Sequence, residues 1–420
     1  MAEKVVLAYS GGLDTSVAVH WLTKERGYDV IALTVDVGLD RGEKNIGDRA
    51  RAAGAIDFHW INARDDFIRY FAYPALAAGA VYQGRYPLAT ALARPLIAKL
   101  MVDVARETGA AAVAHGCTGK GNDQVRFDVS VQALAPDLRI VAPVREWELR
   151  TRASEIEYAK KYDIDVPVTK ENSYSVDENL WGRSIESGAL EDPWTEPPED
   201  AYAWTRAVAE TPDEPAYIEL AFERGLPVSL DGEVLDGVSM TQRLNKLAGE
   251  HGIGRIDHVE DRLVGIKSRE VYEAPAAVTL LCAHDALETL TLSRAQLRLK
   301  AAIAREYAEL IYDGLWFTAH HQDLASYVQS TQRHVSGKVR LRLHKGQVTA
   351  VGRESPRSLY AFSLATYEEG DQFDQSAAEG FISIWGLPVR VQAQAQLLTD
   401  AQEPLHIATP DEGRSTTAQT

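Results

Sequence analysis

Two adjacent glycines near the start of the chain follow an aliphatic run and precede a helical pattern. The segment reads Ala8-Tyr9-Ser10-Gly11-Gly12-Leu13-Asp14-Thr15-Ser16. Glycine lets the backbone turn tightly and approach an anion without a Cβ atom in the way. The N–H groups that open the helix, with the hydroxyls of Ser10, Thr15 and Ser16, would face that anion at the positive end of the helix dipole. The segment therefore predicts a phosphate-binding loop.

Asp14 follows the glycines and could serve either of two purposes. Its carboxylate can cap the helix, or it can approach a magnesium ion bound to the phosphates. The loop has no Gly-Lys-Ser/Thr ending, so it is not a Walker loop, and it does not match the dinucleotide fingerprint. The plain alternative is an ordinary tight turn between a strand and a helix.

A second polar cluster extends from Ala114 to Arg126 and holds three glycines within six residues. Its side chains offer both donors and a carboxylate, as a substrate with amino and carboxylate groups requires. Arg126 suits a carboxylate, Asp123 suits an ammonium group, and Thr118 and Asn122 are neutral partners. A flexible surface turn is the alternative interpretation.

The pattern does not identify a general base. His115 directly precedes the second loop, but a histidine at the end of a strand is more often structural. Asp14 and Asp123 are the candidates for a catalytic role, and a phosphate oxygen of the nucleotide could accept a proton instead. No cage of protein ligands for a metal is expected.

Alternating strand and helix patterns position these loops. Aliphatic runs predict strands at Lys4–Tyr9, Asp29–Val37, Ile56–Ile61, Ala111–His115 and Leu138–Val141. Helical patterns follow from Asp14 and at Arg41–Gly54, Asp65–Ala78 and Ala93–Thr108. This alternation predicts an α/β domain with a parallel sheet covered by helices on both faces. Its ligands belong at the carboxyl ends of the strands, where the two loops can converge.

The pattern changes after about residue 165 and predicts a second, α+β domain. It contains predicted strands at Tyr217–Phe222 and Pro227–Leu230, helices at Met240–His251 and Ser293–Tyr312, and a hairpin at Val335–Val351. An aliphatic stripe at Phe381–Leu398 indicates a terminal helix, and residues 400–420 have the composition of a disordered tail. We expect four segments: 1–165, 166–365, 366–399 and 400–420.

Composition limits the class of protein. A chain of 420 residues is too long for one hydrophobic core. With 61 acidic and 44 basic residues its formal net charge is −17, which argues against a dedicated nucleic-acid binder. The two cysteines, Cys117 and Cys282, form no CxxC pair, and no signal segment or membrane span is apparent, so we expect a cytoplasmic protein.

The first loop resembles the PP-loop of ATP pyrophosphatases, enzymes that cleave ATP between the α and β phosphates and adenylate an oxygen. Its pattern is SGGxDTS after the first strand. The resemblance implies a nucleotide-binding domain of the adenine nucleotide α-hydrolase type, in which this loop holds the departing pyrophosphate.

The second cluster, HGCTGKGNDQVRF at residues 115–127, is similar to the signature of the argininosuccinate synthase family. Further matching segments are Arg85–Pro95, Asp177–Ile185, Gly254–Tyr272 and Gly352–Tyr360. They occur in order, and the resemblance covers about residues 4–398. It implies that citrulline is adenylated by ATP and that the amine of aspartate then displaces AMP to form argininosuccinate. It also implies Mg2+ with the ATP and a homotetramer.

The resemblance carries over a set of binding residues. For ATP it implies Ala8, Tyr9, Ser10, Gly11, Gly12, Leu13, Asp14, Thr15, Ser16, Val35 and Gly116. For aspartate it implies Thr118, Asn122 and Asp123. For citrulline it implies Tyr86, Asn122, Arg126, Ser175, Ser184, Glu260 and Tyr272. Taken singly, Tyr86 would be a packed aromatic, Ser175 a cap and Glu260 a solvated charge.

The chain departs from the family pattern at three positions. Ala91 stands where serine is common, so one hydroxyl contact to citrulline is missing or moved to Thr90. Leu39 stands where glutamine is common, and Cys117 replaces a small residue.

Two other functions remain as alternatives. Another PP-loop enzyme, such as a tRNA thiolase or a glutamine-dependent amidase, would need paired cysteines with a basic face or an additional glutaminase domain. A non-catalytic nucleotide-binding protein would not need both polar loops.

Overall fold

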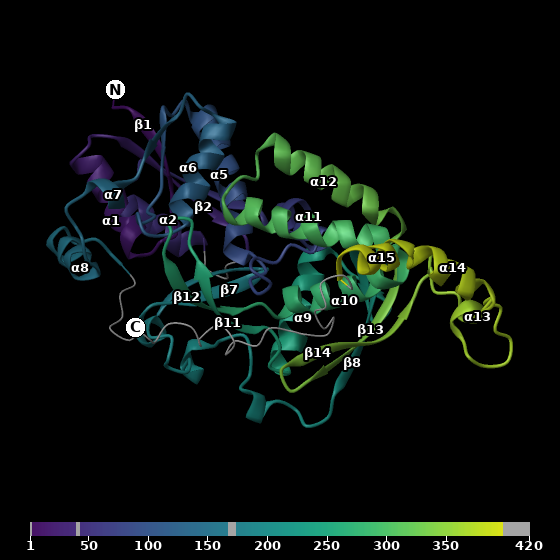
Figure 1. Cartoon of the computed structure of the whole chain (residues 1–420). Helices are drawn as coiled ribbons and strands as arrows, with labels where there is room; N and C mark the ends of the chain where they lie inside the picture. Colours follow the sequence, from purple (N-terminus) through teal and green to yellow (C-terminus); the bar gives the residue numbers. More distant parts are fainter. Residues whose placement is uncertain (1, 39–42, 167–173, 398–420) are drawn as a thin grey trace, which may run out of the picture. The chain divides into compact units, whose positions relative to one another are not determined.

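The computed structural model describes residues 2–38, 43–166 and 174–397 (Figure 1). The chain divides into two compact units, Met1–Leu359 and Tyr360–Thr420. Among the described residues, no helix combines the length and the apolar character that crossing a membrane requires. The predictions made for Leu39 and for the tail 400–420 lie outside the described residues.

The first sheet has five parallel strands in the order β3-β2-β1-β4-β5. They are β1 (Lys4–Ala8), β2 (Asp29–Asp36), β3 (Asp57–Asn62), β4 (Ala112–Ala114) and β5 (Arg139–Val141). The chain moves from β1 through β2 to β3 and then returns to place β4 on the other side of β1. The strand order therefore reverses at β1, and sheets of this type bind ligands at the carboxyl ends beside such a reversal. Both polar loops leave the sheet there.

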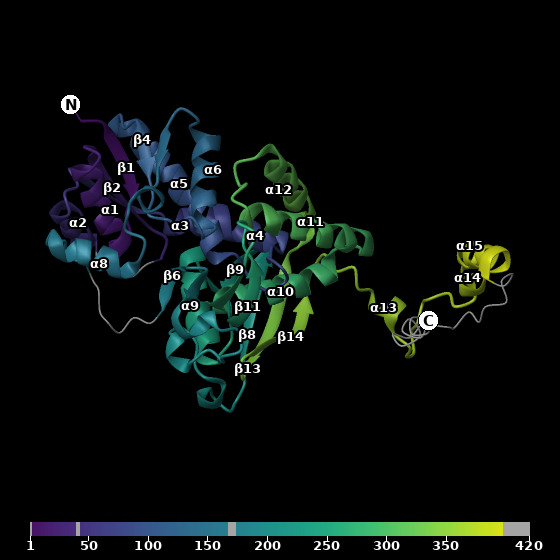
Figure 2. The same cartoon turned by 60° about the vertical axis from the view of Figure 1, so that its left-hand side comes forward.

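Helices cover both faces of this sheet, as predicted. Val5 and Leu7 of β1 pack in one apolar cluster and Val6 packs in another, because alternate residues of a strand point to opposite sides. The first cluster contains residues of α1 (Leu13–Lys24), α2 (Glu43–Ala52) and α8 (Arg152–Lys161). The second contains residues of α5 (Ala89–Thr108) and α6 (Asp123–Leu134), which lie near β1 and β4 in Figure 2.

Two helical segments differ in detail from the prediction. The stretch expected at Asp65–Ala78 is helical throughout but changes from α3 (Arg64–Phe67) through a π-helical turn (Ile68–Ala72) to α4 (Tyr73–Ala78). Helix α5 begins at Ala89 rather than at the predicted Ala93. The Tyr86 hydroxyl accepts the Thr90 N–H at 2.9 Å, a side-chain cap that periodicity does not reveal.

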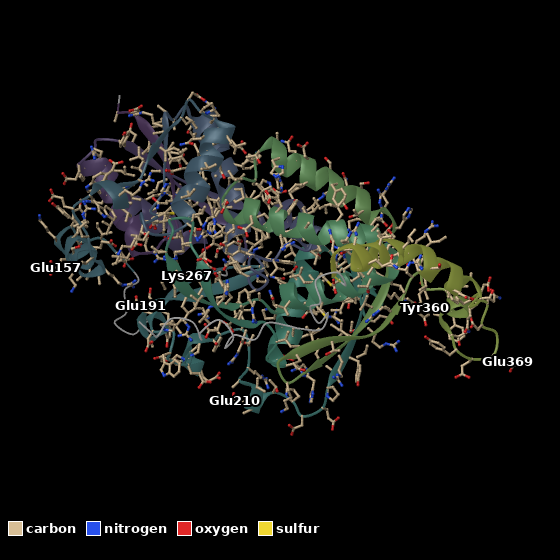
Figure 3. The ribbon with its side chains drawn as sticks, viewed as in Figure 1. Glu157, Glu191, Glu210, Lys267, Tyr360 and Glu369 are labelled. Atoms are coloured by element: carbon tan, nitrogen blue, oxygen red, sulfur yellow. The ribbon has the colours of Figure 1, made fainter. Side chains whose placement is uncertain are left out.

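The rest of the first unit contains two antiparallel sheets. The sheet beside the polar loops has the order β11-β12-β7-β6 and consists of β6 (Ser175–Asn179), β7 (Gly182–Glu186), β11 (Arg255–Asp261) and β12 (Lys267–Glu273). Lys267 at the start of β12 is labelled in Figure 3. The other sheet has the order β10-β9-β8-β13-β14 and consists of β8 (Ala216–Glu223), β9 (Leu226–Leu230), β10 (Glu233–Val234), β13 (Gly337–His344) and β14 (Gln347–Glu354).

Four long helices accompany these sheets: α9 (Gly237–Glu250), α10 (Pro275–Thr291), α11 (Arg294–Tyr312) and α12 (Ala319–Thr331). The predicted α/β class with an α+β second region is therefore confirmed. The sequence patterns did not identify the hairpins β6–β7 and β11–β12, nor α10 and α12.

The terminal unit is helical but interrupted. The helix predicted at Phe381–Leu398 is divided into α14 (Ala377–Trp385), α15 (Leu387–Gln392) and a π-helical turn (Ala393–Leu397). The break falls at Gly386, two residues before Pro388, whose ring nitrogen has no hydrogen to donate. Large apolar side chains of α14 are exposed, among them Phe381, Ile384 and Trp385.

Candidate active site

The predicted phosphate loop links β1 to α1 by a turn that glycine makes possible. Gly11 has a φ of +74°, in the left-handed region, and the extended Gly12 is the N-cap of α1. Gly12 supplies no side-chain cap, so the first N–H groups of α1 remain available to an anion. The interpretation of Asp14 as the helix cap is wrong, because Gly12 takes that position and Asp14 lies in the first turn.

The hydroxyls of the loop do not all face the same way. Ser10 Oγ and Thr15 Oγ1 lie 3.1 Å apart, and both residues line one cavity. Ser16 is fully buried, and its Oγ lies 3.0 Å from the hydroxyl of Tyr9. The Ser16 hydroxyl therefore points into the protein interior, while Ser10 and Thr15 are on the cavity side.

The cavity has a volume of about 860 Å³, a size typical of small-molecule sites. Its wall includes all but one of the residues expected to bind ATP: Ala8, Tyr9, Ser10, Gly11, Gly12, Leu13, Asp14, Thr15, Val35 and Gly116. The exception is Ser16. Ser175 from β6 also lines the cavity, so the wall combines the parallel sheet with the neighbouring antiparallel sheet.

The two polar loops lie against each other at the carboxyl ends of β1 and β4. A Cβ atom added at Gly116 would lie 3.2 Å from Thr15 Cγ2, closer than most such contacts. Glycine at 116 therefore allows the second loop to pass against the first. The predicted convergence of the two loops is confirmed.

His115 lines the cavity but both of its ring nitrogens have protein partners. Its Nδ1 accepts the backbone N–H of Cys117 at 3.2 Å, and its Nε2 lies 2.7 Å from Asp128 Oδ1. Asp128 in turn accepts from Arg145 at 2.9 Å. An Nδ1 that accepts leaves the proton on Nε2, so this arrangement suits a structural role at the strand end.

Charged groups from two helices surround the phosphate loop. Arg49 of α2 donates to the carbonyl of Gly11 at 3.1 Å, and Arg152 at the start of α8 lines the cavity. Arg152 forms no salt bridge with any described residue. Burial and the nearby Asp14 carboxylate raise the pKa of Glu155, also on α8, to about 8. This end of the cavity therefore combines backbone donors, two guanidiniums and a pair of carboxyl groups.

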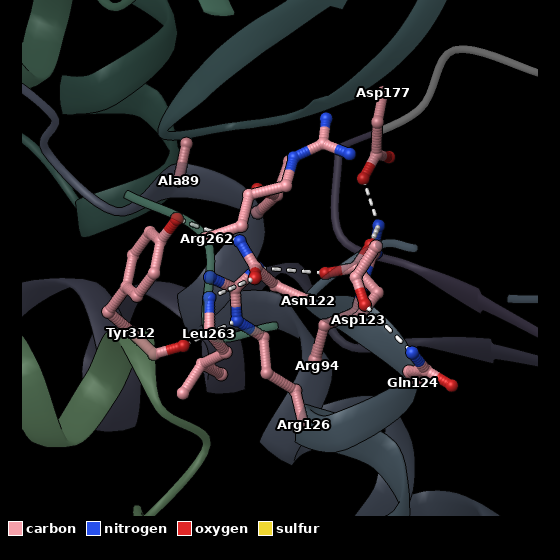
Figure 4. A network of polar contacts seen from close by, with 12 residues as sticks. Ala89, Arg94, Asn122, Asp123, Gln124, Arg126, Asp177, Arg262, Leu263 and Tyr312 are labelled. Carbon is pink, nitrogen blue, oxygen red and sulfur yellow. Dashed lines mark hydrogen bonds and ion pairs between the residues drawn. The ribbon is translucent and has the colours of Figure 1, made fainter. Parts of the chain in front are cut away.

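The second loop leads into a dense polar network (Figure 4). Asn122 donates to the Tyr312 hydroxyl at 2.8 Å and accepts the backbone N–H of Leu263 at 2.9 Å. Asp123 accepts from Arg126 at 2.9 Å and from Arg94 at 2.7 Å. Burial opposes the charge of Asp123, but the two guanidiniums outweigh it and lower its pKa to about 2. Asp123 is therefore an ionised carboxylate.

Four residues expected at the citrulline site share one face of the sheet β11-β12-β7-β6. Tyr272 pairs with Ser184, and Ser184 pairs with Asp177 on β6. Ser175 is two residues from Asp177, and Glu260 is four residues from the partner of Tyr272 on β11. Because side chains of a strand alternate, all of them point to the same side. Strand pairing thus brings Ser175 and Tyr272 onto one face although they are nearly one hundred residues apart in the sequence.

The same face carries an excess of carboxylates. Glu270 of β12 and Glu186 of β7 both accept from Arg262 at 2.6 Å. Glu260 accepts from the hydroxyl of Tyr272 at 2.6 Å. Arg262 thus contacts two of these carboxyl groups, and Glu260 is bonded by a neutral hydroxyl, an arrangement that favours a cationic group on a ligand.

Tyrosines close the network around Glu260, which is 3% exposed. Tyr312 donates to Glu260 Oε1 at 2.5 Å, and the ring of Tyr86 stacks on that of Tyr272 with centroids 4.1 Å apart. The hydroxyl of Tyr86 lies 2.6 Å from Thr90 Oγ1, so Thr90 supplies a hydroxyl beside the position where Ala91 lacks one. Tyr312 was not identified from the sequence, where it was only the end of an amphipathic helix.

The structure therefore places the expected site residues in two adjoining groups. One group lines the open cavity and contains the phosphate loop, Val35, Gly116 and Ser175. The other is the closed polar network and contains Tyr86, Asn122, Asp123, Arg126, Ser184, Glu260 and Tyr272. Thr118 lies at the surface of the second loop. Chemically, one end suits a polyphosphate and the other suits zwitterionic amino acids.

Two family models match the chain. The model described as arginosuccinate synthase N-terminal HUP domain matches residues 4–165, and the model described as arginosuccinate synthase C-terminal domain matches residues 174–392.

Curated proteins named argininosuccinate synthase are similar over nearly the whole chain. The protein from Dehalococcoides mccartyi is 56% identical over 403 residues, which cover 96% of this chain and 99% of that protein. The protein from Gloeobacter violaceus is 56% identical over 396 residues, covering 94% of this chain and 99% of the relative. The protein from Rubrobacter xylanophilus is 56% identical over 388 residues, covering 92% and 94%.

Proposed function

Because the chain belongs to the argininosuccinate synthase family, whose members ligate citrulline and aspartate with ATP in arginine biosynthesis, we propose that its two adjoining groups of residues divide this reaction between them. The chain is a carbon–nitrogen ligase, and ATP is one of its substrates. The cavity end takes the ATP, and the polar network takes the amino acids. Family membership excludes the thiolase, the amidase and the non-catalytic protein as alternatives.

The first step takes place at the phosphate loop. The ureido oxygen of citrulline attacks the α-phosphorus of ATP, the bond to the bridging oxygen breaks, and pyrophosphate leaves. The observation that carries this proposal is the uncapped start of α1 behind Gly11 and Gly12 in the cavity wall. Its N–H groups neutralise charge on the departing phosphates. Val35 and Gly116 line the nucleoside side of the same cavity.

The second step takes place beside the second loop. The ammonium group of the bound aspartate loses a proton to a phosphate oxygen, and the resulting amine attacks the carbon of the citrullyl-adenylate. The carbon–oxygen bond to AMP breaks, AMP leaves, and argininosuccinate forms. Thr118, Asn122 and Asp123 bind the aspartate. Asp123 is ionised between two guanidiniums, so it suits the ammonium form of the incoming amino acid.

Citrulline lies on the carboxylate-rich face of the antiparallel sheet. Arg126 binds its carboxylate and Glu260 its ammonium group, since these are the oppositely charged partners within the network. The neutral groups complete the site: Tyr86, Asn122, Ser175, Ser184 and Tyr272. Arg126 Nη2 is buried and has no partner among the described residues, so a substrate oxygen there would satisfy it.

Mg2+ would accompany the ATP. Asp14 lines the cavity beside the phosphate loop and offers a carboxylate oxygen, the ligand type that Mg2+ prefers. When bound, the ion would neutralise charge on the phosphates, and the backbone N–H groups of the loop would orient them.

Three further features belong to the proposal. We assign an ATP-binding domain to 1–165 and a substrate domain to 166–365; the matched ranges, 4–165 and 174–392, support the boundary near residue 165, and the second continues past residue 365. The segment 366–399 joins copies of the chain into a homotetramer, because the apolar side chains of α14 are exposed in the single chain. The protein acts in the cytoplasm.

The function is tested by mixing the purified protein with ATP, citrulline and aspartate and omitting each in turn. AMP, pyrophosphate and argininosuccinate should appear only with the full mixture. Citrulline and ATP alone should support exchange of labelled pyrophosphate into ATP, because the first step is reversible. Hydrolysis of ATP to ADP and phosphate, or product formation independent of citrulline, would contradict the proposal.

A further inference from the structure

Arg152 is a guanidinium of the cavity wall that is not bonded to the protein. It is the first residue of α8, and it lines the cavity that contains the phosphate loop. Among the described residues it has neither a hydrogen-bond acceptor nor a salt-bridge partner. An arginine carries five N–H donors in a planar fork that fits phosphate oxygens. These donors are therefore available to a ligand in the cavity.

The start of α8 is held beside the phosphate loop by other side chains. Glu155, one turn after Arg152, interacts with Asp14 in the first turn of α1. Further along α8, the Tyr158 hydroxyl lies 3.0 Å from His20 Nδ1 on α1. The two helices lie side by side (Figure 1, Figure 2). Arg152 is thus placed next to the glycine turn although it is far from it in the sequence.

The other guanidiniums of the cavity wall already have protein acceptors. Arg49 donates to the backbone of the phosphate loop at 3.1 Å, and Arg183 donates to Glu273 at 2.8 Å. Arg94 is bonded to carboxylates of α6 and β6. Within the described part of the wall, Arg152 is therefore the guanidinium whose acceptor would have to come from a ligand.

The place of α8 in the fold indicates which phosphates Arg152 can reach. Helix α8 packs with α1 and α2 on one face of the parallel sheet, whereas α5 and α6, beside the amino-acid end, pack on the other. In the proposed first step, the α-phosphate faces the ureido oxygen of citrulline. The β- and γ-phosphates then extend away from citrulline over the start of α1, on the side of α8.

We propose that Arg152 binds the β- and γ-phosphates of ATP and neutralises the charge of the departing pyrophosphate. The inference rests on the proposed function. When the ureido oxygen attacks the α-phosphorus, the bond to the bridging oxygen breaks and its electron pair stays on the pyrophosphate. Because negative charge increases on this leaving group, a guanidinium beside it stabilises the transition state more than the bound ATP.

Binding of two products to Arg152→Gln tests the assignment. Calorimetric titration of the purified protein with magnesium pyrophosphate should give a Kd about 10- to 100-fold above that of the wild type, as expected for loss of a charge-assisted hydrogen bond. The Kd of AMP should change less than about threefold, because AMP has no β- or γ-phosphate. Arg152→Lys keeps the charge but loses the planar fork, so it should recover part of the affinity.

The first step of the reaction should respond in the same way. In citrulline-dependent pyrophosphate–ATP exchange, Arg152→Gln should lower kcat and raise KM for pyrophosphate about 10- to 100-fold. The KM for citrulline should stay within about threefold of the wild type, since Arg152 lies at the opposite end of the phosphates.

Arg150→Gln is the matched control. Arg150 is exposed two residues earlier and does not line the cavity, so its replacement should leave both Kd values and the exchange unchanged. Arg152→Gln should also keep the melting temperature of the wild type, because its side chain has no protein partner to lose. Weaker binding of pyrophosphate would then not be due to unfolding.

An unchanged Kd of pyrophosphate in Arg152→Gln, or an equal weakening of pyrophosphate and AMP, would overturn the inference and leave the proposed function intact. Absence of citrulline-dependent exchange in the wild type would instead overturn the proposed function.

Discussion

Tyr312 donates a hydrogen bond of 2.5 Å to Glu260, and through it the end of α11 is joined to the antiparallel sheet. The same hydroxyl accepts from Asn122 at 2.8 Å, and the Tyr312 carbonyl accepts from Arg126 at 2.9 Å. One residue from a helix far along the chain thus holds three of the proposed citrulline residues in place.

Tyr312→Phe should therefore weaken the use of citrulline. Loss of the hydroxyl removes the hydrogen-bond partner of two buried atoms, Glu260 Oε1 and Asn122 Nδ2, which costs about 1–3 kcal/mol. We expect kcat/KM for citrulline to fall about 5- to 100-fold in steady-state assays. Tyr307→Phe is the matched control: Tyr307 is buried on the same helix, and its hydroxyl forms no hydrogen bond with a described side chain. Equal effects of the two variants would refute this role for Tyr312.

Asp123→Ala should separate the two steps of the reaction. Removing the ionised carboxylate should weaken the use of aspartate by about 1.5–3 kcal/mol, the range for a charge-assisted hydrogen bond. Exchange of pyrophosphate into ATP with citrulline alone should survive. Asp123→Asn preserves the shape of the side chain and shows how much of the effect is due to charge. Collapse of the exchange in both variants would mean that Asp123 serves the first step instead.

His115→Asn should lower stability more than catalysis. The variant loses the contact with Asp128, so we expect a lower melting temperature, from a loss of about 1–3 kcal/mol. The dependence of kcat on pH should keep its shape, because His115 does not exchange protons with the substrates. A loss of kcat of about 100-fold or more, the usual contribution of a general base, in a variant that remains folded would assign His115 to catalysis.

Glu270→Gln should change how stability depends on pH. Burial and the neighbouring Glu186 and Glu260 raise the pKa of Glu270 from 4.5 to about 7, although Arg262 opposes the shift. A carboxyl group whose pKa is higher in the folded state than in the unfolded state binds its proton more tightly in the folded protein. The free energy of unfolding therefore decreases as the pH rises from about 4.5 to about 7.

Glutamine does not ionise, so the Glu270→Gln variant does not lose stability in this way as the pH rises. The stability of the variant relative to the wild type should therefore increase by on the order of 1–3 kcal/mol between pH 4.5 and pH 8. Thermal unfolding at several pH values measures the difference. Glu223→Gln, at the exposed end of β8, should show no such trend. A constant difference between Glu270→Gln and wild type would contradict the assignment.

The parallel sheet could be predicted from the sequence because its central strands, β1, β2 and β4, are buried on both faces. Runs such as Lys4–Ala8 and Asp29–Asp36 then have a mostly aliphatic interior and are easily recognised. The hairpin of β6 and β7 could not, because Ser175–Asn179 reads SVDEN and resembles a polar loop. Its residues line the open cavity and only Asn179 is buried, so the usual alternation of buried and exposed side chains does not appear.

The candidate site was predictable only where its residues lie close together in the sequence. The two glycine loops are of this kind, and the remaining proposed residues came from the family resemblance. Arg94 and Tyr312 lie on helices whose patterns describe packing alone, and they join the site only through tertiary contacts. Asp123 illustrates the same limit, since its sequence context does not reveal the two guanidiniums that keep it ionised.

The central claim is that the glycine turn between β1 and α1 holds the phosphates that leave as pyrophosphate. A crystal structure with α,β-methylene-ATP, citrulline and Mg2+ tests it most directly. We predict that the β- and γ-phosphates accept hydrogen bonds from the backbone N–H groups around Gly11 and Gly12, with the α-phosphate toward the citrulline ureido oxygen. Phosphates bound elsewhere, with the Gly11–Gly12 turn making no contact with the nucleotide, would contradict the account.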